Sequence, residues 1–279
     1  MCEEYYLNVL QENNYFKLIR KLTSDETETF FKASSYMQKL NTKLYFFRIV
    51  DYNYNELKKF EKEYNTLINN QPLSVLDENA IFFEFTRLLH NYLSSVNLFL
   101  NQYDTNVKRD YENEFFKEYD EHRKDLHAEN LSYRLIYEFQ NEIRHTKIPP
   151  ITIKAKRKGY LEPLEAKFYI QKDYLNIKGL KKDDEFQKLD ELIDIYEHME
   201  NMNSYLFELA SIILKFELDL HIEYYDFIKR LIGKIDVEGR PCIMNYNEFN
   251  EFKIKPSITF IDKRFIELID KIKKYKDVI

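Results

Sequence analysis

The stretch SVLDENAIFFEFTRLLHNYLSSVNLFLNQYDTNV, residues 74–107, decides the fold of this chain. Its apolar side chains recur every three or four residues, which predicts a long helix with one broad apolar face. That face consists of Phe82, Phe85, Leu89, Tyr92, Leu93, Val96 and Leu100. The chain has only 4 Gly and 6 Pro in 279 residues, whereas an all-β protein of this length would need many turn residues. We therefore predict a mainly α protein.

Two further helices are expected directly after this stretch. Residues 108–125 are heavily charged, and residues 128–146 repeat a helical pattern of apolar side chains. That pattern is formed by Leu131, Leu135, Ile136, Phe139 and Ile143. Consecutive helices with short connections pack as antiparallel neighbours. Residues 76–148 are therefore predicted to form an antiparallel helical bundle.

The N-terminal segment, residues 1–75, is expected to contain helices and one short strand. Residues 3–21 have apolar side chains at helical spacing, and Thr23 or Ser24 could cap a second helix. The segment TKLYFFRIV, residues 42–50, is short and rich in aromatic and β-branched residues. This composition favours a strand.

The C-terminal segment, residues 149–279, is expected to begin with a β-hairpin. Apolar and polar residues alternate in ITIKAKRK, residues 151–158, and again in AKFYIQK, residues 166–172. A long helical region over 181–233 follows, expected to be two helices, and a final helix starts near Asp262. No linker of low complexity separates these parts, so we expect them to pack on the helical core as one body.

The composition excludes several classes of function. The net charge of -6 does not provide the global basic surface of a general nucleic-acid binder. Two cysteines cannot form a disulfide framework or a Cys-rich zinc site. The sequence lacks a phosphate-binding glycine loop, a dinucleotide-binding motif, a nucleophile elbow, a signal peptide and a membrane span. We expect a cytoplasmic protein without a cofactor, a metal or a membrane partner.

A polar stripe marks the candidate site on the helix over 128–146. Arg134, Glu138, Asn141 and His145 lie three or four residues apart, so they share one side of the helix. The apolar residues of this helix lie on a neighbouring stripe. The polar stripe therefore borders the core and could face a groove or a second subunit.

The segment YRLIYEFQNEIRHTKIPP, residues 133–150, resembles the motif of HEPN-type helical domains. In that motif an Arg, usually followed by a polar residue such as Asn, precedes a His by four to six residues. The segment is closer still to uncharacterised bacterial proteins with a YRFLYxLRNYxQHxGxPI pattern. The earlier FTRLLHNYLSSVNLFL, residues 85–100, resembles their preceding NxLLxNYLSS helix. The resemblance covers about residues 80–150 and implies a HEPN-like bundle.

The family contains metal-independent ribonucleases that dimerise to bring two motifs together, among them toxins and phage-defence proteins. The resemblance implies that His145 is the general acid or base and that Asn141 is the polar residue of the motif. Gln140 occupies the position of the family's Arg and cannot neutralise a phosphate. Arg144 points about 100° away on an ideal helix, and Arg134 lies nearly three turns back.

Two interpretations therefore stay open. In the first, the chain is an RNA-directed ribonuclease. In the second, it is a catalytically inactive HEPN-like interaction module that dimerises or binds a protein partner, and His145 only stabilises the end of its helix through the helix dipole. Whether the chain is an enzyme is not decided by these residues.

A basic cluster follows the polar stripe. It consists of Lys147, Lys154, Lys156, Arg157 and Lys158, and three of these lie on the polar side of the expected hairpin. Such a patch could bind an RNA backbone despite the acidic total. A lysine-rich hairpin can also simply be a solvated, protected sheet edge.

Overall fold

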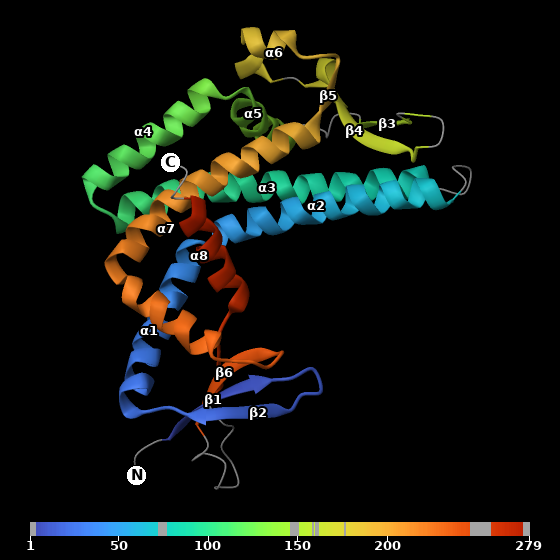
Figure 1. The fold of residues 1–279 in the computed structure, drawn as a ribbon. Helices are drawn as coiled ribbons and strands as arrows, with labels where there is room; N and C mark the ends of the chain where they lie inside the picture. Colours follow the sequence, from blue (N-terminus) through green and yellow to red (C-terminus); the bar gives the residue numbers. More distant parts are fainter. Residues whose placement is uncertain are drawn as a thin grey trace. The chain divides into compact units, whose positions relative to one another are not determined.

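The structure is a computed structural model that describes residues 4–71, 77–145, 151–157, 159, 162–175, 177–245 and 258–275. It is mainly helical with small antiparallel sheets (Figure 1), as predicted. The chain divides into two compact units: unit 1 comprises residues 1–44 and 211–279, and unit 2 comprises residues 45–210. Both boundaries of the three-part division predicted from the sequence lie inside unit 2. No helix of the described residues combines the length and apolar character needed to cross a bilayer.

The long helix predicted in unit 2 is confirmed as α3 (Glu78–Asp110). It starts at Asp77, whose side chain accepts hydrogen bonds from the backbone N–H groups of Asn79 and Ala80, at 3.0 and 3.1 Å. The predicted apolar face is buried except for Phe82, which is 42% exposed. α2 (Tyr45–Asn70) runs alongside α3 (Figure 1), and this pair forms the centre of the unit.

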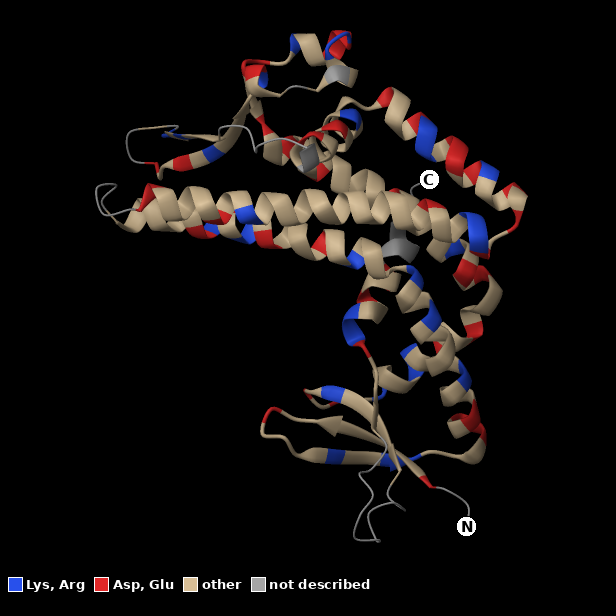
Figure 2. Ribbon diagram, turned by 180° about the vertical axis from the view of Figure 1, so that it is seen from behind, with Lys and Arg blue, Asp and Glu red and all other residues tan. Residues whose placement is uncertain are grey.

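Two shorter helices follow α3. α4 (Asn113–Glu129) carries acidic and basic positions along most of its length (Figure 2), and its buried side chains are Tyr119 and Leu126. α5 (Leu131–His145) has a stronger apolar face and packs against both α3 and α4. The two helices predicted over 108–125 and 128–146 are thus present, with the first shifted by several residues toward the C-terminus.

A three-stranded antiparallel sheet completes unit 2. It contains β3 (Ile151–Lys156), β4 (Glu165–Gln171) and β5 (Leu192–Asp194) in that order, which confirms the predicted hairpin. Phe168 of β4 is fully buried and stacks on Phe85 of α3, with ring centroids 4.4 Å apart. Short helical segments connect β4 to β5: η2 (Lys172–Tyr174), η3 (Lys178–Leu180) and α6 (Asp184–Lys188).

Two asparagines of α2 fasten β4 to the helices. The Asn69 side chain accepts from the Leu164 N–H at 2.7 Å and donates to the Leu164 carbonyl at 2.8 Å. Asn65 binds the Ala166 backbone in the same manner, at 2.7 and 3.4 Å. Side chains one helical turn apart thus match alternate residues of an extended chain, because both spacings are about 6–7 Å.

The described part of unit 1 contains a four-stranded sheet and three helical segments. The strands are β1 (Tyr5–Leu10), β2 (Phe16–Lys21), β6 (Arg240–Asn245) and β7 (Ile258–Phe260), in the order β2-β1-β6-β7. The helices are α1 (Ser24–Lys43) and α8 (Lys263–Tyr275), together with the end of α7 (Ile195–Gly233), which begins in unit 2. α7 is kinked at His221, where φ is -144° and ψ is 36°.

The prediction of a helix over residues 3–21 is wrong, because this segment forms the β1–β2 hairpin. Asn14 adopts a positive φ of 61° in the connecting turn, a conformation that asparagine tolerates better than most residues. Leu7 and Val9 are fully buried on one side of β1. The spacing of the apolar residues matched a helix, but the residues between the two strands form a turn that ends β1 and starts β2.

The strand expected over residues 42–50 is also wrong. α1 ends at Lys43 and α2 begins at Tyr45, so this segment joins two helices. Phe47, Val50 and Tyr54 are buried at helical spacing in α2, and this periodicity outweighs the β propensity of aromatic and β-branched residues. The predicted cap before α1 is confirmed at Thr23, which forms a capping box with Glu26.

Candidate functional site

α5 holds the polar stripe predicted from the sequence. The helix is anchored in unit 2 by buried Tyr133, Leu135, Ile136 and Phe139. This apolar side fixes the rotation of α5, so the stripe residues border the packed interior. The elements next to it are α3, α4, η3 and α6.

Arg134 is engaged on every side of its guanidinium group. Nε donates to Asp183 Oδ2 at 2.8 Å, and Nη2 donates to Glu185 Oε2 at 2.7 Å. Nη1 donates to the carbonyls of His127 and Ala128 at the end of α4, at 3.2 and 2.6 Å. The Arg134 side chain is only 14% exposed. Arg134 thus joins α4 to α6, and a phosphate could bind it only by displacing these partners.

Asp183 is both the ion-pair partner of Arg134 and the N-cap of α6. Its Oδ1 accepts from the N–H groups of Glu185 and Phe186 at 2.9 and 3.1 Å. Burial alone would raise the pKa of this carboxyl, but the hydrogen bonds from Phe186 and Arg134 together outweigh burial and lower it. Asp183 is therefore held in its charged form.

Glu138 lies one turn after Arg134, against the short η3 segment. A Cβ on Gly179 would come within 3.0 Å of Glu138 Oε1, so the backbone approaches the carboxylate closely here. Burial raises the pKa of Glu138. This carboxyl therefore keeps its proton to a higher pH than an exposed glutamate does.

Gln140, at the position of the Arg in the HEPN motif that this segment resembles, is 4% exposed. Its Nε2 donates to Asn141 Oδ1 at 2.8 Å, while its Oε1 is buried without a hydrogen-bond partner among the described residues. A buried carbonyl left in this state costs about 1–3 kcal/mol. The pair could therefore accept one further donor, from water or from a ligand.

The remaining predicted site residues are described only in part. His145 and Arg144 form the last turn of α5 by their backbone, but their side chains lie outside the described residues, as do Lys147 and Lys158 entirely. The catalytic role predicted for His145 and Asn141, and the binding roles predicted for the others, stay predictions.

The hairpin after α5 gathers positive charge on one face. Lys154 and Lys156 share this face of β3 with Lys167 and Tyr169 of β4, because Lys154 lies directly opposite Lys167 in the register. All three lysines are exposed, as is Arg157 directly after β3. We call Lys154, Lys156, Arg157 and Lys167, together with Tyr169, the basic face.

Local contacts order the basic face. The Lys154 ammonium lies 5.9 Å from the Tyr169 ring centroid, and Lys167 Nζ pairs with Asp194 Oδ2 at 2.7 Å. The hydrogen bond that Lys167 donates to Asp194 raises the pKa of Lys167. Lys167 and Tyr169 were missed by the sequence analysis, although the alternation in residues 166–172 would have placed both beside Lys154.

A second polar group lies deeper, between α5 and α7. His198 Nδ1 is 2.9 Å from Ser132 Oγ, and Asn201 donates to the same oxygen at 3.1 Å. His198 is buried, and burial lowers its pKa, so the neutral form is favoured. This arrangement is a satisfied internal network that stabilises the packing of α7 on α5.

No group of three or more His, Cys, Asp or Glu side chains among the described residues is arranged to hold a metal ion. Comparisons with models of protein families, with curated proteins and with solved structures found no match. The arguments about function therefore rest on the residues and their geometry.

Proposed function

We propose that this protein is a HEPN-like, RNA-directed protein that binds single-stranded RNA on the basic face. The observation that carries the proposal is the direct cross-strand pairing of Lys154 with Lys167. Like charges opposite each other destabilise a sheet. A phosphate placed between these lysines would neutralise Lys154 and would compete with Asp194 for Lys167.

The charge balance of the hairpin supports local binding. Four cationic side chains lie on or next to the basic face, against the carboxylates of Glu165 and Asp194 on the neighbouring strand positions. Acidic positions are visible among the basic ones on this part of the chain (Figure 2). Because exposed charges are screened beyond about 8 Å at physiological ionic strength, the acidic total of the chain does not prevent contact here.

Tyr169 gives the basic face a means of contacting bases. Its ring is half-buried between Lys154 and the β5 strand. Stacking of a base on an aromatic ring contributes about 1–3 kcal/mol and tolerates any sequence. Lysines around such a ring suit an unpaired RNA strand, whose bases are free to stack.

Cleavage of the RNA is the further possibility that the HEPN resemblance implies, through His145 and Asn141. Two observations favour binding without cleavage. Arg134 is occupied by Asp183 and Glu185, and the residue at the family's Arg position, Gln140, is buried. The same observations favour the second candidate, a HEPN-like interaction module that forms a homodimer or binds a protein partner.

The test is a titration of a fluorescently labelled single-stranded RNA with the full chain, followed by anisotropy at several salt concentrations. Four phosphate contacts on a single strand predict a slope of log affinity against log salt of about -3. Lys154→Glu with Lys156→Glu should weaken binding about tenfold or more and reduce the slope by about 1.4, since two contacts are lost. Tyr169→Ala should weaken binding at all salt concentrations, while Tyr169→Phe should not.

The matched control is Lys17→Glu with Lys215→Glu, which changes two exposed lysines of unit 1 and alters the net charge equally. Equal loss in both double variants would show that only total charge matters and would refute the basic face. If the wild-type protein does not bind RNA, the RNA-directed proposal is refuted and the interaction module is the remaining candidate. Analytical ultracentrifugation would then show whether the chain forms a dimer. Incubating bound RNA with EDTA, using wild type and His145→Ala, separates binding from metal-independent cleavage.

A further inference from the structure

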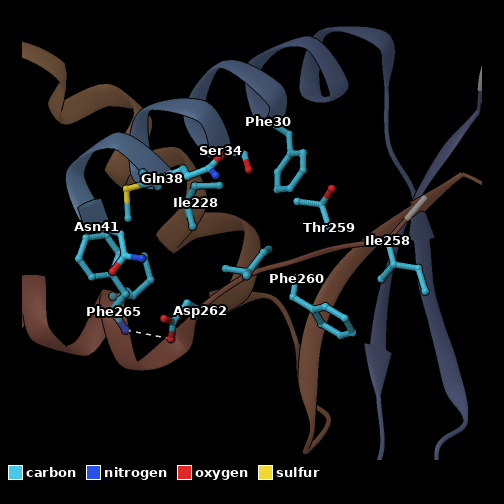
Figure 3. Close-up of a pocket in the computed structure, with 13 residues that line it drawn as sticks. Phe30, Ser34, Gln38, Asn41, Ile228, Ile258, Thr259, Phe260, Asp262 and Phe265 are labelled. Carbon is cyan, nitrogen blue, oxygen red and sulfur yellow. Dashed lines mark hydrogen bonds between the residues drawn. The ribbon is translucent and has the colours of Figure 1, made fainter. Parts of the chain in front are cut away.

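A cavity of about 370 Å³ lies within unit 1, between α1, the end of β7 and the start of α8 (Figure 3). Its volume is within the range of small-molecule sites, about 300–1,000 Å³. Phe30, Ser34 and Gln38 of α1 form one wall, because residues four apart share a side of a helix. Thr259 forms part of the opposite wall.

The inner surface of this cavity is apolar. Met37, Phe265 and Ile266 are buried, and Ile228 of α7 contributes a further buried side chain. These side chains would remove a ring of a ligand from water. The rim is polar, and Gln38 and Asp262 on it are exposed.

The hydrogen-bonding groups at the rim are mostly uncharged. The side chains of Ser34, Gln38 and Thr259 make no hydrogen bond to another described residue, whereas Asp262 Oδ1 accepts from the Phe265 N–H at 3.2 Å. Of the 13 described residues that line the cavity, none is Lys, Arg or His, and Asp262 alone carries a formal charge. Among the side chains that line the cavity, an anionic ligand would thus meet one carboxylate and no cation.

We propose that this cavity binds an uncharged ring compound with a carboxamide or lactam edge. The ring lies against Met37 and Phe265, and its amide edge meets Gln38. A carboxamide side chain offers one acceptor and two donors, so it can form a pair of hydrogen bonds with another amide. This site lies in unit 1 and is independent of the basic face in unit 2.

The test compares nicotinamide with nicotinate, which have the same ring and size but differ in charge. The full chain, labelled at its methionine methyl groups, is titrated with each compound and observed by nuclear magnetic resonance. The Met37 signal is identified by its loss in Met37→Leu. We expect nicotinamide to shift this signal and nicotinate at the same concentration to leave it in place.

Gln38→Leu should weaken nicotinamide binding about fivefold to tenfold, because two neutral hydrogen bonds are lost. The matched control is Gln102→Leu, an exposed glutamine of α3, which should leave the affinity unchanged. An unshifted Met37 signal with nicotinamide, or an equal shift with nicotinate, would overturn the proposal. Equal affinity of Gln38→Leu and wild type would overturn it as well.

Discussion

Removing the guanidinium of Arg134 should destabilise unit 2 by about 3 kcal/mol. Arg134 and Asp183 are 14% and 15% exposed, and loss of one partner of a buried ion pair costs about 3–5 kcal/mol. Glu185 is 58% exposed, so its pair contributes little. We therefore expect the lower end of this range for Arg134→Met, which keeps most of the apolar stem.

Urea unfolding followed by far-ultraviolet circular dichroism measures this loss. A loss of about 3 kcal/mol lowers the midpoint by about 1 M when the slope is about 3 kcal/mol/M. Amide hydrogen exchange of α5 and α6 assigns the loss to unit 2. Arg134→Lys keeps the charge but not the planar fork, so its effect should be intermediate.

Arg87→Met is the matched control for this experiment. Arg87 donates to Glu84 at 2.8 and 2.6 Å, but the two side chains are 48% and 41% exposed. An exposed pair of this kind contributes less than about 1 kcal/mol. Equal midpoints for the two variants, or no change in Arg134→Met, would refute the structural role of Arg134.

Two further predictions concern stability. The hydrogen bond from Arg20 lowers the pKa of Glu26 from 4.5 to about 2. The charged Glu26 therefore stabilises the folded state above pH 4.5, and this stabilisation is lost as the pH falls toward 2. Because the side chains of Arg20 and Glu26 are both partly exposed, Glu26→Gln should lower the free energy of unfolding by about 1–2 kcal/mol near neutral pH. Denaturant titrations at several pH values should find that this difference shrinks below pH 4.5. A difference that stays constant with pH would contradict the assignment. Phe168→Ala removes a fully buried ring stacked on Phe85 and should cost about 3–5 kcal/mol; unchanged amide exchange in β4 would argue against this.

The helical core could be predicted because its pattern is long and local. The face of α3 repeats over many turns, so single exceptions such as Phe82 did not change the interpretation. Residues 42–50 were misread because the segment spans a helix end and a helix start, and its composition resembled a strand when taken alone. Short segments are decided by what they pack against, which a single sequence does not contain.

The sequence predicted where the candidate site lies on the chain, but not which partners its side chains bind. The helical spacing placed Arg134 and Glu138 on one stripe, and both lie on α5. The partners of Arg134 were not foreseeable, since Asp183 and Glu185 are 49 and 51 positions away in the chain. A charged side chain next to the apolar core can bind either a ligand or another part of the chain. Only the tertiary structure shows which of the two partners it has.

Gln140 also has a role that the sequence alone did not reveal. The HEPN motif that this segment resembles has an Arg at this position. In the structure Gln140 is an interior amide, 4% exposed, that donates a hydrogen bond to Asn141. A guanidinium placed here would lose its hydration and would need an acidic partner, a penalty of several kcal/mol for an unpaired ion. The neutral amide leaves only its carbonyl without a partner among the residues that the structure describes, which costs about 1–3 kcal/mol. The polar stripe can therefore retain its fold without the phosphate-binding charge of the HEPN motif, and the RNA contact that we propose uses the cations of the hairpin that follows.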